Sequence, residues 1–414
     1  MDIRAMAQSA RKAARQLAVM GTKEKNTILE AMAIALGEHK EDIFKANALD
    51  VESGKENGLS SAMIDRLIIN EARLSSMQDG LRTMISLSDP VGEVENGWKL
   101  ENGIHASKVR VPIGVIGMIY ESRPNVTVDA SGLALKSGNS IILRGGKEAL
   151  ETNKALSQIL NEAGIQAGLP KGAVQLISDT DRALVKDLVT MDDLVDVIIP
   201  RGGQGLKKAI VSQASVPVII TGAGVCHVYV DKAANLEQAL PIIENAKIQR
   251  PGVCNAIETL LIHEGVNTKW IESTVNTLQE KGVEVVGCEK LSTIVSSVTP
   301  ATDEDWATEY LSLKLSIRIV SDLDMAMDHI ETYGTRHSES ILTEDINTAE
   351  KFLNGVDAAA VYVNSSTRFT DGSVFGFGGE IGISTQKLHA RGPMGLQALT
   401  TTKFILRGQG HIRS

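Results

Sequence analysis

The sequence predicts an α/β fold with two compact domains, the first of which is built on a doubly wound parallel sheet. From Val111 onward, short apolar runs alternate with longer segments of helical periodicity, which is typical of strands joined by crossover helices. The run at 195–199 is apolar almost without interruption, as expected for a parallel strand buried on both faces. The chain has 414 residues, and single cores rarely exceed about 250 to 300 residues, so we expect two domains.

The N-terminal region, up to about Leu87, has apolar residues at helical spacing and is predicted to be a helical lead-in. Residues 3–20 are amphipathic and carry arginines, as a transit peptide would, but the pattern continues past Gly21 and favours a mature helix. Two Asn-Gly turn signals then predict a hairpin or projecting arm over 89–108. Because ribbon edges usually pair with another edge, this arm indicates oligomerisation.

Strands and helices are expected to alternate through the rest of the chain. In the first domain, the expected strands are 113–120, 140–144, 174–177, 195–199 and 216–221, and the expected helices are 126–136, 150–163 and 205–212. A second series contains strand-like runs at 258–262, 283–286, 316–320, 340–342 and 359–363, and the Gly-rich tail ends in another at 400–406. We therefore predict a first domain over 1–225, including the arm, a second domain over 226–363, and a segment over 364–414 that returns to the first domain and the arm.

Composition and charge narrow the class of protein. Apolar residues make up 43% and charged residues 22% of the chain, the mix of an ordinary globular protein. The net charge of −9 argues against nucleic-acid and anionic-membrane partners, which attract clustered Lys and Arg. No run approaches the roughly 18 apolar residues of a membrane span, and three cysteines without a Cys-x-x-Cys pair indicate a reducing, cytoplasmic setting. The histidines show no metal-ligand spacing, so no metal is expected.

Cys254 is the strongest candidate nucleophile. It ends a Pro-Gly turn directly before a strand-like run. Arg250 and Lys247 precede it, and nearby cations lower the pKa of a thiol and favour the reactive thiolate. The alternative is a buried, unreactive thiol, which is the commoner state of a lone cysteine. Cys226 lies in an apolar run and Cys288 in a loop, and neither is expected to take part in catalysis.

Two glycine-containing turns follow predicted strands and could face a shared ligand. Gly202 and Gly203 precede a helix, where glycines let the backbone approach a pyrophosphate. Arg144 and Lys147 follow another strand, where a cationic pair suits a ribose 2′-phosphate. Neither segment is Gly-x-Gly-x-x-Gly or a Walker A loop, and tight turns with solvated charges are the alternatives. Ligands of such sheets bind at the carboxyl ends of the strands, where the sequence places Arg144, Arg201 and Thr221.

These motifs resemble a known superfamily. The segment 112–125, the glycine loop 200–206 and the thiol of Cys254 together resemble the aldehyde dehydrogenase superfamily. Within it, the segments that resemble the γ-glutamyl phosphate reductase family are 119–126, 249–256 and 367–372. The resemblance covers nearly the full length. It implies an aldehyde dehydrogenase-like fold, with a Rossmann-type cofactor domain, an α/β catalytic domain and a small β oligomerisation arm.

The resemblance also implies a reaction, the NADPH-dependent reduction of L-glutamyl 5-phosphate to L-glutamate 5-semialdehyde and phosphate, which is the second step of proline biosynthesis. It would proceed through a thioacyl group on Cys254. Oxidising aldehyde dehydrogenases place a Glu before a Leu-Gly-Gly turn to hydrolyse the thioester, and here Ile220 stands at that position and cannot act as a base. The oxyanion would be stabilised by the N–H of Cys254 and by the side chain of either Ser122 or Asn125.

Cofactor and substrate residues are implied in the same way. Arg144 matches the Lys that contacts the adenosine ribose, and Lys147 replaces the acidic residue of NAD-preferring members, so NADP is expected. Glu309 matches the Glu that holds the nicotinamide ribose. The substrate carries a phosphate and a carboxylate, which need cations. The candidates are Arg123, Arg250 and Lys247, followed by Arg336, His337, His389 and Arg391.

Two other functions stay open. The first is reduction of a different acyl phosphate or acyl-CoA, because the sequence shows no side-chain code for glutamate. The second is a nucleotide-binding scaffold that kept the fold and lost the chemistry. The sequence also leaves open the number of subunits, and whether a glutamate 5-kinase passes its acyl phosphate directly to this chain.

Overall fold

The computed structural model describes residues 2–413 and divides into two compact units. Unit 1 comprises the residues through Ile220, Gly376–Gly382 and the residues from Met394 onward, and unit 2 comprises Thr221–Phe375 and Ile383–Pro393. The boundaries therefore fall after 220 and 375, where the sequence suggested 225 and 363. The return segment also leaves one piece, Ile383–Pro393, in unit 2, because the N–H of Gly222 donates to the carbonyl of Ile383 over 2.8 Å.

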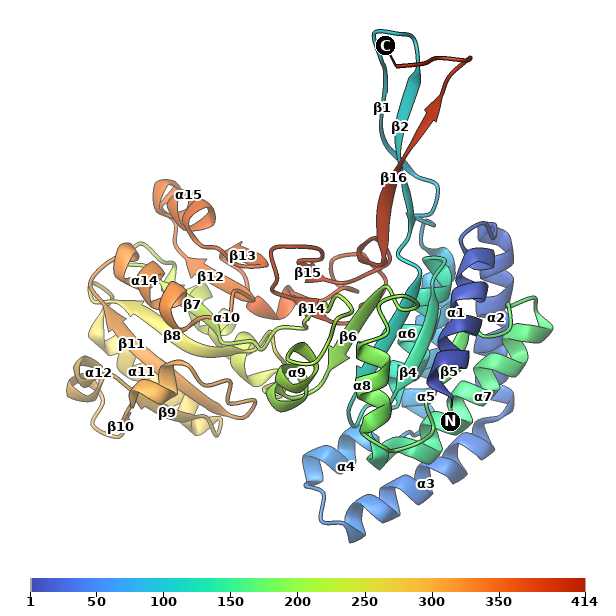
Figure 1. Cartoon of the computed structure of the whole chain (residues 1–414). Coiled ribbons are helices and arrows are strands. Elements are labelled where there is room, and N and C mark those ends of the chain that lie inside the picture. Colours follow the sequence, from blue (N-terminus) through green and yellow to red (C-terminus); the bar gives the residue numbers. More distant parts are fainter. Residues whose placement is uncertain (1, 414) are drawn as a thin grey trace. The chain divides into compact units, whose positions relative to one another are not determined.

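Five helices open unit 1, which confirms the predicted helical lead-in (Figure 1). The first buries Ile3, Ala7 and Ala10 on one face, the spacing of a helix that packs on a core. Asp2 caps it by accepting the N–H of Ala5 over 3.0 Å. The helices are α1 (Ile3–Leu17), α2 (Thr22–Glu38), α3 (Lys40–Glu56), α4 (Ser61–Leu67) and α5 (Glu71–Ser86).

A four-stranded parallel sheet forms the centre of unit 1, in the order β5-β4-β3-β6. All residues of β3 are buried, and Ile119, Ile142 and Ile198 belong to one core with residues of α1. From β3, the chain adds β4 and β5 on one side and then β6 on the other. The direction of strand addition therefore changes next to β3, and doubly wound sheets bind ligands at the carboxyl ends of the strands at such a switch point. The elements are β3 (Val115–Tyr120), α6 (Asn125–Lys136), β4 (Ser140–Arg144), η1 (Lys147–Ala149), α7 (Leu150–Gln166), β5 (Val174–Leu176), α8 (Ala183–Val189), β6 (Val197–Arg201) and α9 (Gln204–Val211).

The predicted strand at 216–221 is wrong. This segment makes only two isolated bridges, between Ile198 and Val218 and between Thr221 and Ser384. The N–H of Ile198 donates to the carbonyl of Pro217 over 2.8 Å, but Pro217 has no N–H with which to continue a ladder. An apolar run that contains a proline therefore ends as a connector.

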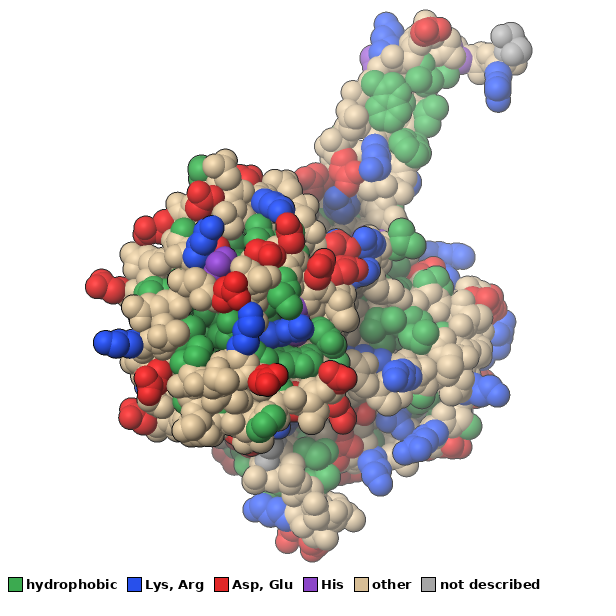
Figure 2. Space-filling model, turned by 90° about the vertical axis from the view of Figure 1, so that its left-hand side faces the viewer, with side chains coloured by type: hydrophobic (Ala, Val, Ile, Leu, Met, Phe, Trp, Pro, Cys, Tyr) green, Lys and Arg blue, Asp and Glu red, His purple; other side chains and the backbone are tan. Residues whose placement is uncertain are grey.

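A three-stranded antiparallel sheet forms the arm of unit 1, which confirms the predicted hairpin (Figure 1). The strands are β1 (Val94–Lys99), β2 (His105–Pro112) and β16 (Thr400–Arg407), with β2 in the middle. Figure 2 shows apolar side chains along the arm, where Trp98, Phe404 and Leu406 are exposed. The rings of Trp98 and Phe404 meet edge to face with centroids 6.0 Å apart.

Unit 2 is built on a seven-stranded parallel sheet in the order β10-β9-β11-β8-β7-β12-β13, and the predicted strand runs of the second series are all strands. Val228, Leu260 and Ile317 are fully buried in its main core. No helix among residues 2–413 is long and apolar enough to span a membrane. The strands are β7 (Cys226–Val230), β8 (Ile257–His263), β9 (Glu284–Gly287), β10 (Thr299–Pro300), β11 (Lys314–Val320), β12 (Ser338–Leu342) and β13 (Ala360–Val363), with a small pair β14 (Ile383–Ser384) and β15 (Gly392–Pro393). The helices are α10 (Leu236–Ile248), α11 (Thr268–Glu280), α12 (Glu289–Ile294), α13 (Asp303–Trp306), α14 (Leu323–Tyr333) and α15 (Ile346–Gly355), with the short turns η2 (Thr367–Phe369) and, in unit 1, η3 (Gln397–Leu399).

Candidate active site

Cys254 lies in the turn between α10 and β8 of unit 2, which we call the Cys254 turn (residues 249–256). Its side chain is half-buried, so the thiol is not walled off in the core. The thiol of Cys226, on β7, donates to the carbonyl of Cys254 over 3.2 Å. Cys226 itself is fully buried, as the sequence predicts. Burial raises the pKa of the Cys226 thiol well above its usual value, so this cysteine stays a neutral packing residue.

Asn255 anchors the Cys254 turn to the segment around η2. Its side-chain amide donates to the carbonyl of Thr370 over 2.9 Å, and its own carbonyl accepts the hydroxyl of Thr367 over 2.7 Å. The residue is almost completely buried. Buried hydrogen bonds of this kind are costly to lose, so the backbone that carries Cys254 is held in one position.

Arg368 is a further functional candidate. It lies in the segment 367–372 that resembles the γ-glutamyl phosphate reductase family, but the sequence alone indicates no role for it. Its guanidinium donates to the side chains of Asn255 and, over 3.1 Å, of Gln249. Burial lowers the pKa of Arg368, the positive charge of Arg250 lowers it further, and Cys254 acts in the opposite direction. Arg368 and Arg250 therefore place positive charge near Cys254, the setting that favours a thiolate.

Glu309 reaches the Cys254 turn through Gly224. The N–H of Gly224 donates to the carboxylate of Glu309 over 2.6 Å. A Cβ added to Gly224 would overlap the carbonyl oxygen of Cys254 and lie 2.8 Å from its Cα. The backbone at Gly224 thus packs directly on the nucleophile's own backbone, and glycine is required by this close approach.

Lys247 does not take the predicted substrate-binding role. Its side chain is fully buried, with the ammonium ion-paired to Glu258 and donating to the carbonyl of Ile257 over 2.9 Å. Burial lowers the pKa of Lys247 and raises the pKa of Glu258 to about 7. The ammonium of Lys247 is therefore paired with Glu258 inside the core of unit 2, where a substrate anion cannot contact it.

The less central candidates are placed as follows. Arg336 is ion-paired with Glu331 over 3.0 Å, and Arg391 is ion-paired with Asp357 over 2.8 Å. His337 is fully buried, with its Nδ1 2.8 Å from the hydroxyl of Ser338. Thr221, predicted to contact the cofactor, is buried at the start of unit 2. His389 is exposed and lies in unit 2, whereas Arg123 is half-buried and lies in unit 1.

A cavity of about 1120 Å³ lies in unit 1 at the carboxyl ends of β3 and β4. It is large enough for a substantial part of a dinucleotide, and its position is that of the ligand site in doubly wound sheets. Its cationic lining residues are Arg144, Lys147, Arg182 and Lys186. The last two come from α8 and its N-cap, and the sequence did not predict them because they do not lie in a turn after a strand.

Arg144 and Lys147 differ in how they are held. The guanidinium of Arg144 donates to the carbonyls of Gly145, over 2.9 Å, and Thr180, over 3.2 Å. Burial lowers its pKa. Lys147 is exposed at the start of η1. Arg144 is therefore held by the loop before α8, whereas Lys147 is an exposed residue in the lining of the cavity.

The glycine loop after β6 is closed by an acidic side chain. The N–H of Gly203, the N-cap of α9, donates to the carboxylate of Glu121 over 2.8 Å. A Cβ on Gly202 would lie 2.7 Å from the carboxyl carbon of Glu121. Arg201 ends β6 and lowers the pKa of Asp129 against the larger effect of burial, which raises that pKa to about 6. Arg201, Gly202 and Gly203 are not among the residues that line the cavity, whose lining on this side begins with Gly205 and Leu206 of α9.

Ser122 lies between β3 and α6 in unit 1, and Asn125 is the first residue of α6; the two differ in hydrogen-bond capacity. Both the N–H and the hydroxyl of Ser122 donate to the carboxylate of Glu148, each over 2.7 Å. The amide of exposed Asn125 donates to Asp129 over 2.9 Å. A hydroxyl has one proton to donate, whereas an amide nitrogen has two. Asn125 can therefore donate to a further acceptor without losing its present partner.

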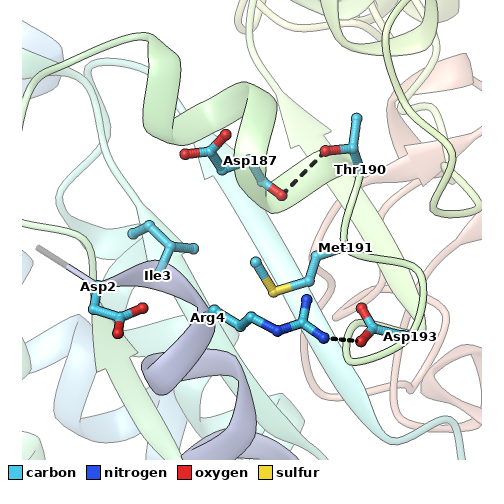
Figure 3. Close-up of a pocket in the computed structure, with 7 residues that line it drawn as sticks. All are labelled: Asp2, Ile3, Arg4, Asp187, Thr190, Met191 and Asp193. Atoms are coloured by element: carbon cyan, nitrogen blue, oxygen red, sulfur yellow. Dashed lines mark hydrogen bonds and ion pairs between the residues drawn. The ribbon is translucent and has the colours of Figure 1, made fainter.

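A smaller hollow of about 380 Å³ lies between the start of α1 and the end of α8 (Figure 3). Two of its charged lining residues, Arg4 and Asp193, are at least half exposed and paired with each other. The remaining lining residues are Asp2, Ile3, Asp187, Thr190 and Met191. It offers no nucleophile, and we do not assign it a role in catalysis. Within residues 2–413, no cluster of three or more His, Cys, Asp or Glu side chains could hold a metal.

Comparisons with known proteins agree with a thiol-dependent site on a Rossmann-type fold. The sequence model of the aldehyde dehydrogenase family matches residues 1–314. A γ-glutamyl phosphate reductase from Moorella thermoacetica is 56% identical over 413 residues, which cover 100% of this chain and 99% of the relative. A γ-glutamyl phosphate reductase from Caldanaerobacter subterraneus subsp. tengcongensis is 52% identical and is covered completely, as is this chain. The crystal structure of the Thermotoga maritima γ-glutamyl phosphate reductase is 49% identical, with a TM-score of 0.98 and 100% coverage of both chains.

The chain therefore belongs to the aldehyde dehydrogenase family, whose members are oxidoreductases that use a nicotinamide cofactor. The relatives that match it from end to end at more than half identity are γ-glutamyl phosphate reductases. Both expectations of the sequence, the superfamily and the branch within it, are confirmed.

Proposed function

We propose that this chain reduces L-glutamyl 5-phosphate to L-glutamate 5-semialdehyde and phosphate with NADPH, the second step of proline biosynthesis. The observation that carries the proposal is the end-to-end similarity to γ-glutamyl phosphate reductases, combined with a half-buried thiol at Cys254. An acyl phosphate already has a good leaving group. The enzyme therefore needs a nucleophile, an oxyanion site and a hydride donor, and it needs no metal for these steps.

The first step belongs to Cys254. Its thiolate attacks the δ-carbonyl carbon, a carbon–sulfur bond forms, the carbon–oxygen bond to phosphate breaks, and phosphate leaves. Arg250 and Arg368 supply the positive charge that stabilises the thiolate and attracts the doubly anionic substrate. Arg123 is a further substrate cation that we retain from the resemblance.

The oxyanion formed at the carbonyl needs fixed donors. We assign these to the backbone N–H of Cys254 and to the side chain of Asn125, because the hydroxyl proton of Ser122 already goes to Glu148. Loss of one oxyanion donor typically costs about 10²- to 10³-fold in rate. Collapse of the thiohemiacetal oxyanion re-forms the carbonyl double bond, breaks the carbon–sulfur bond, and so releases the aldehyde and the thiolate of Cys254.

The cofactor site is assigned to the cavity of unit 1. When bound, NADPH supplies the hydride that reduces the thioacyl group. Lys147 would pair with the ribose 2′-phosphate, while Arg144 shapes the adjoining loop. Four cationic residues line the cavity beside the acidic Glu121 and Glu148, and this excess of positive charge fits a ligand with several phosphates. Glu309 would hold the nicotinamide ribose, and the turn at Arg201, Gly202 and Gly203 would adjoin the pyrophosphate.

The experiment that tests the function is the reverse reaction, phosphate-dependent reduction of NADP with glutamate 5-semialdehyde. We expect turnover with the parent protein and none with Cys254→Ser, although that variant should still bind NADPH in a fluorescence titration. Turnover by Cys254→Ser at a rate near that of the parent would rule out the mechanism. Other aldehydes and arsenate or CoA in place of phosphate distinguish this substrate from those of related reductases.

We also propose that the arm joins copies of this chain into a homo-oligomer. Trp98, Phe404 and Leu406 expose apolar surface on a narrow sheet whose outer strands leave unpaired edges. Light scattering should find more than one subunit in the parent and fewer in Phe404→Lys. A parent that is monomeric at micromolar concentration would refute this proposal.

A further inference from the structure

The ion pair between Lys247 and Glu258 flanks the Cys254 turn, yet it takes no part in the proposed reaction. Both side chains are at most 1% exposed. Replacing such a pair with apolar residues of similar volume is often neutral or even stabilising. Stability alone therefore does not explain it, and its other contacts indicate what it does.

Glu258 holds the backbone of a second functional segment. Its Oε1 accepts the N–H of Leu311 over 3.1 Å, while the other carboxylate oxygen pairs with Lys247. Leu311 has a φ of 53°, a left-handed conformation that residues with a Cβ rarely adopt unless their surroundings impose it. The hydrogen bond that the N–H of Leu311 donates to Glu258 is such a constraint. It fixes residues 308–312, which we call the Glu309 segment.

The Glu309 segment in turn contacts the nucleophile's backbone. The carboxylate of Glu309 accepts the N–H of Gly224 over 2.6 Å, and Gly224 packs on Cys254 without room for a Cβ. Lys247 precedes Cys254 on α10 and Glu258 follows it on β8. The pair therefore ties both ends of the Cys254 turn to the Glu309 segment.

We propose that Lys247 and Glu258 are positioning residues that fix the Glu309 segment against the Cys254 turn through the N–H of Leu311. The inference rests on the proposed function for its catalytic consequence, because Glu309 is assigned there to the nicotinamide ribose. The contact that matters is the hydrogen bond to Leu311, and the charge of Lys247 serves to orient the carboxylate that makes it.

Two double variants separate the hydrogen bond from the charges. Lys247→Met/Glu258→Gln removes both charges but keeps an oxygen acceptor for Leu311. Lys247→Met/Glu258→Leu removes the acceptor as well. We compare them by hydrogen exchange of a peptide that contains residues 308–312, and by kcat and KM for NADP in the reverse reaction.

With the Gln variant we expect exchange and KM close to those of the parent. With the Leu variant we expect exchange of the Glu309 segment to be about tenfold faster and kcat/KM for NADP to be about tenfold lower, as for a lost positioning hydrogen bond. Equal exchange and equal kinetics in the two variants would overturn the inference. If the Leu variant is poorly folded, Lys247→Met/Glu258→Met gives the same comparison, because a thioether is only a weak acceptor.

A matched control comes from another buried ion pair, between Lys25 and Asp89 in unit 1, whose side chains are 0% and 7% exposed and 2.9 Å apart. Lys25→Met/Asp89→Asn should change the unfolding midpoint without changing KM or exchange in residues 308–312. If it changed them as much as the Leu variant does, a general loss of stability would replace positioning as the explanation. If the parent lacks phosphate-dependent activity, the proposed function fails, while the exchange comparison still tests the positioning contact.

Discussion

Substitution of Gly224 by Ala tests how tightly the nucleophile is packed. The added Cβ would overlap the carbonyl oxygen of Cys254 and lie 2.8 Å from its Cα, whereas heavy atoms in ordinary contact are about 3.5 to 4.0 Å apart. The overlap with the oxygen sets the displacement, so the two segments must separate by more than about 1 Å. A misplacement of about 1 Å at a reacting group can already cost about 10²-fold, and overpacking of this kind costs about 1 to 3 kcal/mol of stability or more.

We therefore expect Gly224→Ala to lower kcat/KM in the reverse reaction by about 100-fold while the protein remains folded at room temperature. Urea denaturation measures the change in free energy of unfolding. Gly80→Ala on α5 is the matched control, because its Cβ would meet the nearest side-chain atom at an ordinary 3.8 Å. Full activity in Gly224→Ala would show that the Cys254 turn can shift freely, which would contradict the packing argument.

Three further predictions follow from the site. Lys147→Glu should lower the ratio of kcat/KM for NADPH to that for NADH by at least about tenfold, because a carboxylate repels the 2′-phosphate; an unchanged ratio would remove Lys147 from the cofactor site. Asn255→Ala should lower the free energy of unfolding by about 1 to 3 kcal/mol in urea, because buried groups that bond to Asn255 would be left unsatisfied. Burial raises the pKa of Asp129 to about 6, so its stabilising contribution is complete below its ordinary pKa and is lost as the pH rises through about 6. As the pH rises from about 4 to about 8, the free energy of unfolding of Asp129→Asn should therefore increase relative to that of the parent. Urea titrations at the two pH values measure this difference, and the opposite trend would contradict the prediction.

Much of the fold could be predicted because most strands are apolar along their whole length. The runs at 140–144 and 258–262 are buried on both faces, and they became β4 and β8. The run at 216–221 has the same texture but contains Pro217, which blocks a ladder. The pairing of β16 with β2 joins segments far apart in the sequence. The sequence predicts that residues 364–414 return to the arm, but a single sequence gives no signal for the partner strand or its register.

The site could be predicted less completely, because a charge near a thiol in sequence need not face it. The closeness of Lys247 to Cys254 in sequence predicts a role in substrate binding. In the structure, Lys247 instead continues the buried stripe of α10 that includes Ala239, Ile243 and Ala246. Helical periodicity could have placed it in the core. Arg368, by contrast, lies far from Cys254 in sequence, and only the fold brings the two together.

The strand β16 has a consequence for the order in which the chain folds as it leaves the ribosome. The residues of unit 2 end at Pro393, so all of them are synthesised before β16, which begins at Thr400. Domains generally fold as units during synthesis, and unit 2 can therefore complete its sheet while the β1–β2 hairpin still lacks its third strand. Unit 1, whose first residues are translated before those of unit 2, is thus completed after unit 2.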